Sequence, residues 1–326
     1  MYAEGRYRTG FAMCLALAGV ALLPAIRTGA DCGSIPYQSP LGGVLEAAED
    51  LTKRASSDEV AFDPLDVVVY EPGQRAIILW NGKRELLLLS TDIKTSEDVS
   101  ILEVIPLPAE PTVTLGDFET FEKMRALVTE KQMWAVAAQG GVNDARPSVA
   151  KAATITFHRK MGAHDVAVVK VLEKEHFVEW VQQFLAAKQA VNPRIRPEFT
   201  DIIENYLARG FNWFVFDTIQ ATDRLQSRQP VQYIFDADAV FYPLEISSLE
   251  NGRTTIDLTV VTQSELTSYP QIRFASRDES GLEITAAELD GVSRGWAGFM
   301  RARDCTVQCL KVKGNIRKLK TDFVAR

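Results

Sequence analysis

Three histidines are the residues best suited to acid–base chemistry in this chain: His158, His164 and His176. Their spacing lacks the H-E-x-x-H pattern that binds zinc on a protease helix. For each of them, a hydrogen-bonded or exposed side chain is favoured over a metal ligand. His164 is kept as a candidate site residue because it lies at the entry to a predicted strand over 166–172, where it could meet an acid from elsewhere in the chain.

Asp236 and Asp238 are the acids that such a site would use. Two residues apart on a strand, they would lie on the same side. Paired carboxylates can share proton transfer or hold calcium. The D-x-D-x-D-G calcium loop is missing, so solvated acids at the end of a strand are the simpler interpretation.

Other patterns for catalysis or binding are weak. Ser148 and Lys151 match the S-x-x-K form of penicillin-recognising enzymes, but the S-D-N and K-T-G motifs are absent. There is no phosphate loop and no dinucleotide glycine fingerprint. Glu71 and Gln74 are polar candidates near a predicted turn at Pro72, and that position explains them without function. We expect no cofactor and no metal, and no catalytic residue can be assigned.

Residues 1–30 are typical of a signal peptide. Arg6 and Arg8 precede an apolar run over 11–26, which is shorter than the roughly 20 residues of a membrane span. Small residues before Asp31 predict cleavage there, and an uncleaved N-terminal anchor is the alternative. No later run is long enough to cross a bilayer. We therefore expect an exported protein that is periplasmic, extracellular or envelope-associated, with no transmembrane segment in the mature chain.

The charge of the chain limits its partners. The whole chain carries −7, and loss of three arginines and one glutamate with residues 1–30 leaves −9. Such a protein repels nucleic acid and anionic membranes as a whole, so nucleic acid is not an expected partner. A basic cluster over 311–320 could tether an anionic envelope polymer, although a solvated strand and turn is the simpler interpretation.

Three cysteines remain after cleavage: Cys32, Cys305 and Cys309. The odd number forbids complete internal pairing, and an oxidising compartment permits one bridge. A predicted strand over 305–313 places Cys305 and Cys309 roughly 13 Å apart, beyond the about 7 Å that a disulfide spans. The predicted bridge joins Cys32 to Cys305 or to Cys309, and both choices stay open.

Two Asn-Gly pairs mark the expected turns between strands. Asn81-Gly82 joins the apolar runs 75–80 and 85–90, which predicts a β-hairpin with a type I′ turn. Asn251-Gly252 predicts a second hairpin. Amphipathic helices are predicted to begin at Asp117, His176, Pro197 and Thr285.

These elements predict an α+β fold, a mixed or mainly antiparallel sheet packed by amphipathic helices. The predicted order is a signal peptide over 1–30, a turn-rich lead-in over 31–66 and an α+β domain over 67–326. That domain could divide into two subdomains near 140–150.

Several segments resemble one known family. They read VYEPGQRAIILWNG, ELLLLSTD, ILEVIPLPAEP, GDFETFEK, GAHDVAVVKV, HFVEWVQQF and FYPLEISS. Together they are similar to exported bacterial and archaeal proteins of domain-of-unknown-function family 2330. The resemblance implies an envelope or extracellular protein with an α+β domain, and it supplies no activity, cofactor or catalytic residue.

Two hypotheses about function follow. The favoured one is a non-enzymatic envelope or extracellular protein that binds an unknown protein or envelope polymer, or has a structural role. The alternative is an extracytoplasmic hydrolase whose site is assembled from distant residues, such as His164 with Asp236 or Asp238. A histidine and a carboxylate that converge in a deep pocket would favour the hydrolase.

Overall fold

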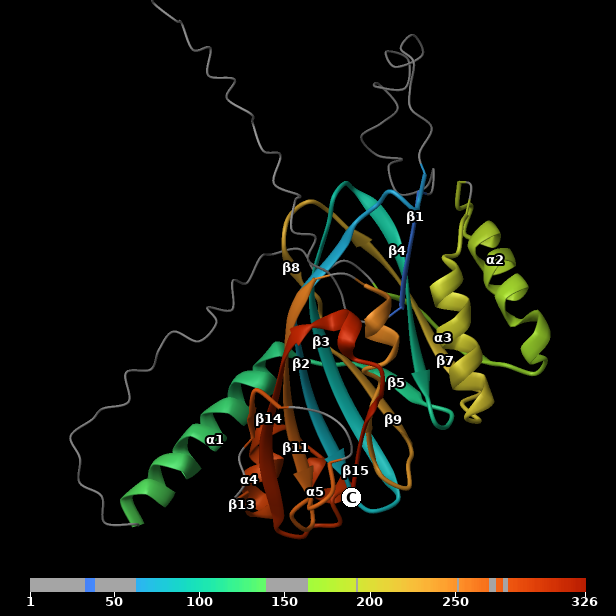
Figure 1. Ribbon diagram of the computed structural model, residues 1–326. Coiled ribbons are helices and arrows are strands. Elements are labelled where there is room, and N and C mark those ends of the chain that lie inside the picture. Colours follow the sequence, from blue (N-terminus) through green and yellow to red (C-terminus); the bar gives the residue numbers. More distant parts are fainter. Residues whose placement is uncertain are drawn as a thin grey trace, which may run out of the picture.

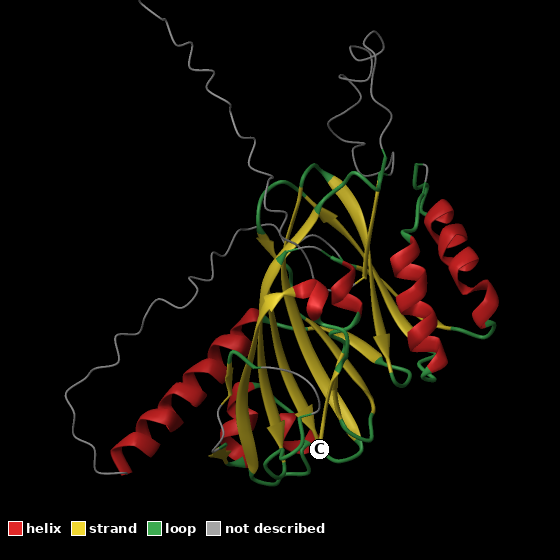
Figure 2. Ribbon diagram, viewed as in Figure 1, coloured by secondary structure: helices red, strands yellow, loops and turns green. Residues whose placement is uncertain are grey.

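The computed structural model describes residues 33–38, 63–138, 164–191, 193–250, 252–269, 274–277 and 281–326. In these ranges the chain forms two large β-sheets with helices on their outer sides (Figures 1 and 2). Most strand pairs are antiparallel, so the predicted α+β class is confirmed. The predicted signal peptide lies outside the described residues.

The larger sheet has nine strands. They are β2 (Val69–Trp80), β3 (Arg84–Thr95), β5 (Thr112–Leu115), β8 (Gln226–Ser227), β9 (Val231–Asp236), β11 (Arg253–Thr262), β12 (Ser276–Arg277), β13 (Leu282–Ile284) and β14 (Cys305–Asn315). The main order is β12-β14-β11-β2-β3-β9-β5, with β13 on β14 and β8 on β3. β11 pairs with β2 in parallel, so the sheet is mixed.

The smaller sheet has the order β1-β4-β7-β6. Its strands are β1 (Gly33–Tyr37), β4 (Val99–Leu107), β6 (Asp165–Lys170) and β7 (Trp213–Ala221). β1 lies in the expected turn-rich lead-in, and its pairing with β4 corrects that expectation. Both sheets take strands from either side of residues 140–150, which themselves lie outside the described residues.

The helices are α1 (Phe118–Ala138), α2 (Phe177–Ala187), α3 (Pro197–Ala208), α4 (Ala286–Val292) and α5 (Trp296–Phe299), with 3₁₀ turns η2 (Lys174–His176), η3 (Ile246–Leu249) and η4 (Ile316–Lys318). The predicted starts hold: Asp117 accepts a hydrogen bond from the backbone of Glu119, and Thr285 forms a capping box. The single helix expected after Thr285 is two short ones, because Gly295 between them has φ 90°.

The elements stack in four layers (Figure 1). Alternate residues of β2 and β3 point to opposite faces of the larger sheet. Ile77 and Leu88 pack against α1, α4 and α5, whereas Ile78 and Leu87 face the smaller sheet. The far face of the smaller sheet is covered by α2 and α3. The run 86–89 is apolar throughout because both faces of β3 are covered.

The hairpin at Asn81-Gly82 is confirmed, but its turn differs from the prediction. Asn81 N donates to Arg84 O at 3.1 Å, so Gly82 and Lys83 are the central residues. Of these two only Gly82 has positive φ, at 84°, which fits a type II′ turn. The Asn81 side chain accepts from the backbone of Lys83 and Arg84 and donates to Phe299 O at 2.9 Å.

The second predicted hairpin, at Asn251-Gly252, is wrong. The strands on its two sides are β10 (Val240–Tyr242), which pairs with β15 (Phe323–Ala325), and β11, which pairs with β14 and β2. Gly252 has the positive φ, 112°, that the motif suggested. The chain leaves that turn toward a different sheet because η3 intervenes after β10.

Candidate functional site

The first of three polar regions is a cluster of buried charges between the two sheets. Glu103 on β4 and Asp217 on β7 are direct cross-strand neighbours, so both carboxylates point the same way. Arg228 follows β8, and its guanidinium forms ion pairs with both acids, at 2.6 Å to Asp217 Oδ2. Its backbone N donates to Thr91 O on β3 at 2.9 Å. Arg228 therefore links the two sheets.

His164 completes this Arg228 cluster. Its Nδ1 lies 2.7 Å from Asp217 Oδ2, and its Nε2 lies 3.2 Å from Gln229 O. Both ring nitrogens thus face an oxygen acceptor, and Arg228 Nη2 lies 3.1 Å from Nδ1. His164 is where the sequence analysis expected it, at the entry to β6.

Burial and pairing shift the pKa values of the cluster in different directions. Burial raises the pKa of Glu103, and the charge of Arg228 only partly opposes this. Burial also acts to raise the pKa of Asp217, but the hydrogen bond from His164 and the charge of Arg228 outweigh it and lower that pKa. The surroundings therefore favour the ionised form of Asp217 more than that of Glu103.

The cluster leaves little room for a substrate. One oxygen of Glu103 and one of Asp217 have no hydrogen-bond partner among the described residues. The cavity that they line with His164 and Arg228 measures about 10 Å³, which is the size of a single water. Its charges already face one another, so the arrangement suits a structural charge layer better than turnover of a substrate.

The predicted partners of His164 were wrong. Asp236 is 81% exposed and lies 3.5 Å from Arg84 at the hairpin end of the sheet. Asp238 is also exposed, and the partners of the His164 side chain in the described residues are Asp217, Gln229 and Arg228. The true partner, Asp217, was missed together with Glu103. A single acid inside an apolar strand, as in ILEVIPL and NWFVFDTI, was the signal for both.

The turn predicted at Pro72 is instead a bulge inside the continuous strand β2, with Glu71 in the bulge and Gln74 in the regular ladder that follows it. Both side chains are buried. Tyr242 donates to Gln74 Oε1 at 2.5 Å, and Ser34 donates to Glu71 Oε1 at 3.5 Å. Pro72 is tolerated because a bulge removes ladder hydrogen bonds. The hydrogen bonds of Glu71 and Gln74 therefore link β2 to β1 and to β10.

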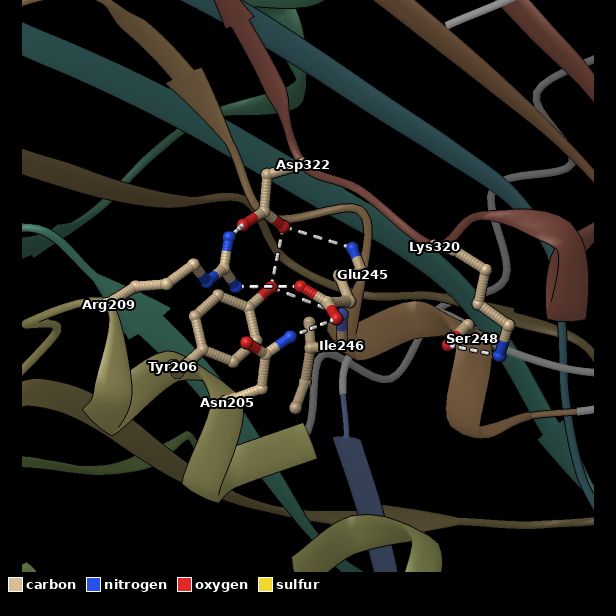
Figure 3. Close-up of polar contacts among 8 residues, drawn as sticks. All are labelled: Asn205, Tyr206, Arg209, Glu245, Ile246, Ser248, Lys320 and Asp322. Atoms are coloured by element: carbon tan, nitrogen blue, oxygen red, sulfur yellow. Dashed lines mark hydrogen bonds and ion pairs between the residues drawn. The ribbon is translucent and has the colours of Figure 1, made fainter. Parts of the chain in front are cut away.

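A second polar region, shown in Figure 3, joins α3 to the C-terminal segment. Tyr206 donates to Asp322 Oδ1 at 2.6 Å. Arg209 forms ion pairs with Asp322 at 2.9 Å and with Glu245 at 2.7 Å. Asn205 donates to the other Glu245 oxygen at 2.6 Å. Burial and the Asp322 charge raise the pKa of Tyr206, so its hydroxyl stays a donor. These contacts hold α3 against the C-terminal segment and against Glu245.

The third region is a groove between α1 and the outer face of β2, β11 and β14, with a volume of about 370 Å³. We call it the α1 groove. Its lining is Arg75, Ala76, Ile77, Phe121, Met124, Arg125, Val128, Asp257, Leu258, Thr259, Ser276, Cys309, Leu310 and Lys311. Apolar side chains make up its floor, and charged ones stand among them. Sequence patterns did not reveal it, because its lining residues come from five separate segments: β2, α1, β11, β12 and β14.

The predicted disulfide bridge and several sequence motifs involve residues outside the described ranges, so they stay predictions. Cys305 and Cys309 lie on one strand, β14, as expected, and burial raises the pKa of the Cys305 thiol to about 11. Cys32 lies outside the described residues, so its bridge is a prediction still, and Ser148, Lys151 and His158 lie outside them as well.

One catalytic-looking pattern was overlooked in the sequence, G-x-S-x-G at Gly291–Gly295. A nucleophile elbow places its serine between a strand and a helix. Ser293 instead follows the end of α4. The pattern therefore has no catalytic context here.

Across the described ranges, no group of three or more histidine, cysteine or acidic residues is arranged to hold a metal ion. In the same ranges, no helix combines the length and the apolar character needed to cross a membrane. His176 is exposed, with Nδ1 3.6 Å from Glu179 on the same helix turn.

A comparison with protein families gives a match over most of the chain. The model of domain-of-unknown-function family 2330, described as an uncharacterised protein conserved in bacteria, matches residues 61–323. No curated protein matches the sequence.

Two solved structures of baculovirus P35 match this chain at 11% identity. The first has a TM-score of 0.37 over 80% of this chain and 92% of that one. The second, a mutated P35 after caspase cleavage, has 0.34 over 77% and 93%. Scores this low carry no argument about function.

Proposed function

Because this chain belongs to domain-of-unknown-function family 2330, whose members supply no known activity, we propose a function from the site alone: an exported, non-enzymatic binding protein of the envelope or extracellular space. Its ligand would lie in the α1 groove. The signal-like residues 1–30 support export, and mass spectrometry of exported protein should find Asp31 at the N-terminus. Intact Met1 on membrane-bound material would contradict cleavage.

The observation that carries the proposal is the volume and lining of the α1 groove. Pockets that hold small molecules measure roughly 300–1,000 Å³ and are mostly apolar with a few polar groups. The groove, at about 370 Å³, falls in this range. Ile77 on β2 and Met124 and Val128 on α1 form its apolar floor. Walls on regular elements hold a ligand without prior rearrangement.

The hydrolase hypothesis has less support. His164 does converge with a carboxylate, Asp217, which is the pairing that a hydrolase would need. The cavity beside that pair, about 10 Å³, admits a water and no substrate. A nucleophile would have to lie beside the other ring nitrogen, Nε2, which faces Gln229 O at 3.2 Å.

Binding of the neutral fluorescent probe N-phenyl-1-naphthylamine to the full mature chain tests the proposal. The wild type should bind it with a rise in fluorescence, and Thr259→Trp, which fills the groove from β11, should weaken binding about tenfold or more. Thr112→Trp is the matched control, since Thr112 is exposed on the edge strand β5. Absence of wild-type binding, or equal binding by Thr259→Trp, would overturn the groove as a ligand site.

A further inference from the structure

The charges that line the α1 groove have the opposite sign to the chain as a whole. Arg75, Arg125 and Lys311 face a single lining acid, Asp257. The complete chain carries −7. A local excess of positive charge beside an apolar floor attracts an anion, and the low polarity of the walls strengthens that attraction.

Arg75 offers a hydrogen-bond donor that the protein does not use. Its Nη2 forms an ion pair with Asp92 on β3. Its Nη1 is buried and has no hydrogen-bond partner in the described part of the chain. A buried donor without an acceptor is unfavourable. Arg75 as a residue lines the groove, so a small turn of its guanidinium toward the groove would let Nη1 meet a ligand acceptor.

The other two cations are available at the groove's walls. Arg125 projects from α1, is exposed, and forms no ion pair within the described ranges. Lys311 lies 3.0 Å from Asp257, with both side chains about half exposed. Exposed pairs of this kind contribute little and exchange partners readily. An anion that approaches Arg125 and Lys311 therefore does not have to break a strong internal interaction.

We propose that the α1 groove binds a straight-chain monocarboxylate, with its alkyl chain on the floor of Ile77, Met124 and Val128 and its carboxylate toward Arg75 and Arg125. The planar guanidinium fork matches a carboxylate better than it matches a spherical anion. The groove volume of about 370 Å³ is at the lower end of the roughly 300–1,000 Å³ of small-molecule pockets, so decanoate is a suitable test ligand. This inference rests on the groove being the ligand site proposed above.

A displacement experiment tests whether the groove prefers a carboxylate. Decanoate and decan-1-ol each compete with bound N-phenyl-1-naphthylamine at about pH 7.5, where the carboxylate is ionised. Decanoate should displace the probe from the wild type at a concentration at least about tenfold lower than decan-1-ol. Arg125→Gln should reduce that ratio severalfold and Arg75→Gln should bring it close to one. Arg84→Gln is the control, since Arg84 lies at the hairpin end and does not line the groove.

The outcomes separate the two proposals. If the probe binds and Thr259→Trp blocks it, but decanoate and decan-1-ol compete equally, the groove is a ligand site and the carboxylate inference is wrong. If Arg84→Gln lowers the ratio as much as Arg125→Gln does, the effect is general charge and the inference is equally wrong. If the probe does not bind at all, both proposals fail.

Discussion

The Arg228 cluster and the α1 groove both contain arginines beside acids, but they differ in what lies around those charges. In the cluster, Arg228 pairs with Glu103 and Asp217 between two sheets, around a cavity of about 10 Å³. In the groove, Arg75 pairs with one acid and leaves Nη1 unpaired beside about 370 Å³. The residues that look catalytic therefore have no room for a ligand, while those that no motif marks have room for one.

This contrast has a physical origin. Charges enclosed between sheets lose their hydration, so they are tolerated only when opposite charges face each other. An exposed charge at the wall of a groove, such as Arg125, stays near solvent and tolerates the lack of a partner. A perturbed carboxylate such as Glu103 can thus mark a structural charge layer as well as a functional site.

The largest expected effect is loss of stability on substitution of Arg228. Arg228→Met leaves Glu103 and Asp217 buried without their counter-ion, and the free energy of unfolding should fall by about 3–5 kcal/mol. Urea denaturation measures this fall in the free energy of unfolding. Arg84→Met, at an exposed pair with Asp236, should cost less than ~1 kcal/mol. Equal costs for the two variants would remove the distinction between an enclosed and an exposed charge.

The two acids of the cluster should respond unequally. Asp217→Asn removes the acid whose pKa is lowered by His164 and Arg228, so it should cost about 2–3 kcal/mol near neutral pH. Glu103→Gln replaces the acid whose ionisation burial opposes, so it should cost less than ~1 kcal/mol. Chemical denaturation of both variants at one pH gives the comparison. If Glu103→Gln cost more than Asp217→Asn, the ionised form of Glu103 would be the more important of the two for stability.

The pH dependence of stability should show the same asymmetry. The folded pKa of Glu103 is raised above 4.5, so its stabilising contribution is complete below pH 4.5 and is lost as the pH rises through the folded pKa. The folded pKa of Asp217 is lowered below 3.8, so its contribution is present above pH 3.8 and is lost as the pH falls through the folded pKa.

Glu103→Gln should therefore flatten the decline of stability above pH 4.5, and Asp217→Asn should flatten the decline below pH 3.8. Urea denaturation midpoints measured across this range test both slopes. An unchanged slope above pH 4.5 in Glu103→Gln would mean that other buried acids, such as Glu85, whose pKa burial also raises, dominate the profile.

The smallest expected effect on stability is at the groove. Arg125→Gln changes an exposed helix residue and should alter the free energy of unfolding by no more than about 0.5 kcal/mol. Its affinity for decanoate should nevertheless fall severalfold, whereas a folded Arg228 variant should keep its affinity. Thermal unfolding with and without decanoate measures both quantities. Loss of decanoate affinity in the Arg228 variant would show that the two regions are coupled.

Local elements of the fold could be predicted because their signals are local. Asp117 caps α1, Thr285 forms its capping box, and the Asn81-Gly82 hairpin forms where the dipeptide stands. The same dipeptide failed at Gly252, since a turn motif fixes the local backbone but does not choose the strand with which the chain then pairs. That choice depends on which apolar faces meet.

The candidate sites were harder to predict than the elements. His164 was recognised, but its acid was sought at Asp236 and Asp238, because both lie close together in the sequence. The actual partner, Asp217, lies 53 residues from His164 along the chain and reaches it across the β6–β7 pair. The α1 groove could not be found at all, because no single segment contributes more than part of one wall.

The sequence by itself determined the periodicity of strands and helices, their caps and most of their turns, and the family to which the chain belongs. These depend on contacts between near neighbours, or on patterns shared with relatives. Only the tertiary structure decided that Glu103, His164, Asp217 and Arg228 share one enclosed layer, and that Arg75 stands at an open groove. Burial and pairing of charge arise from packing between distant segments, and that packing is what separates a structural charge from one able to bind a ligand.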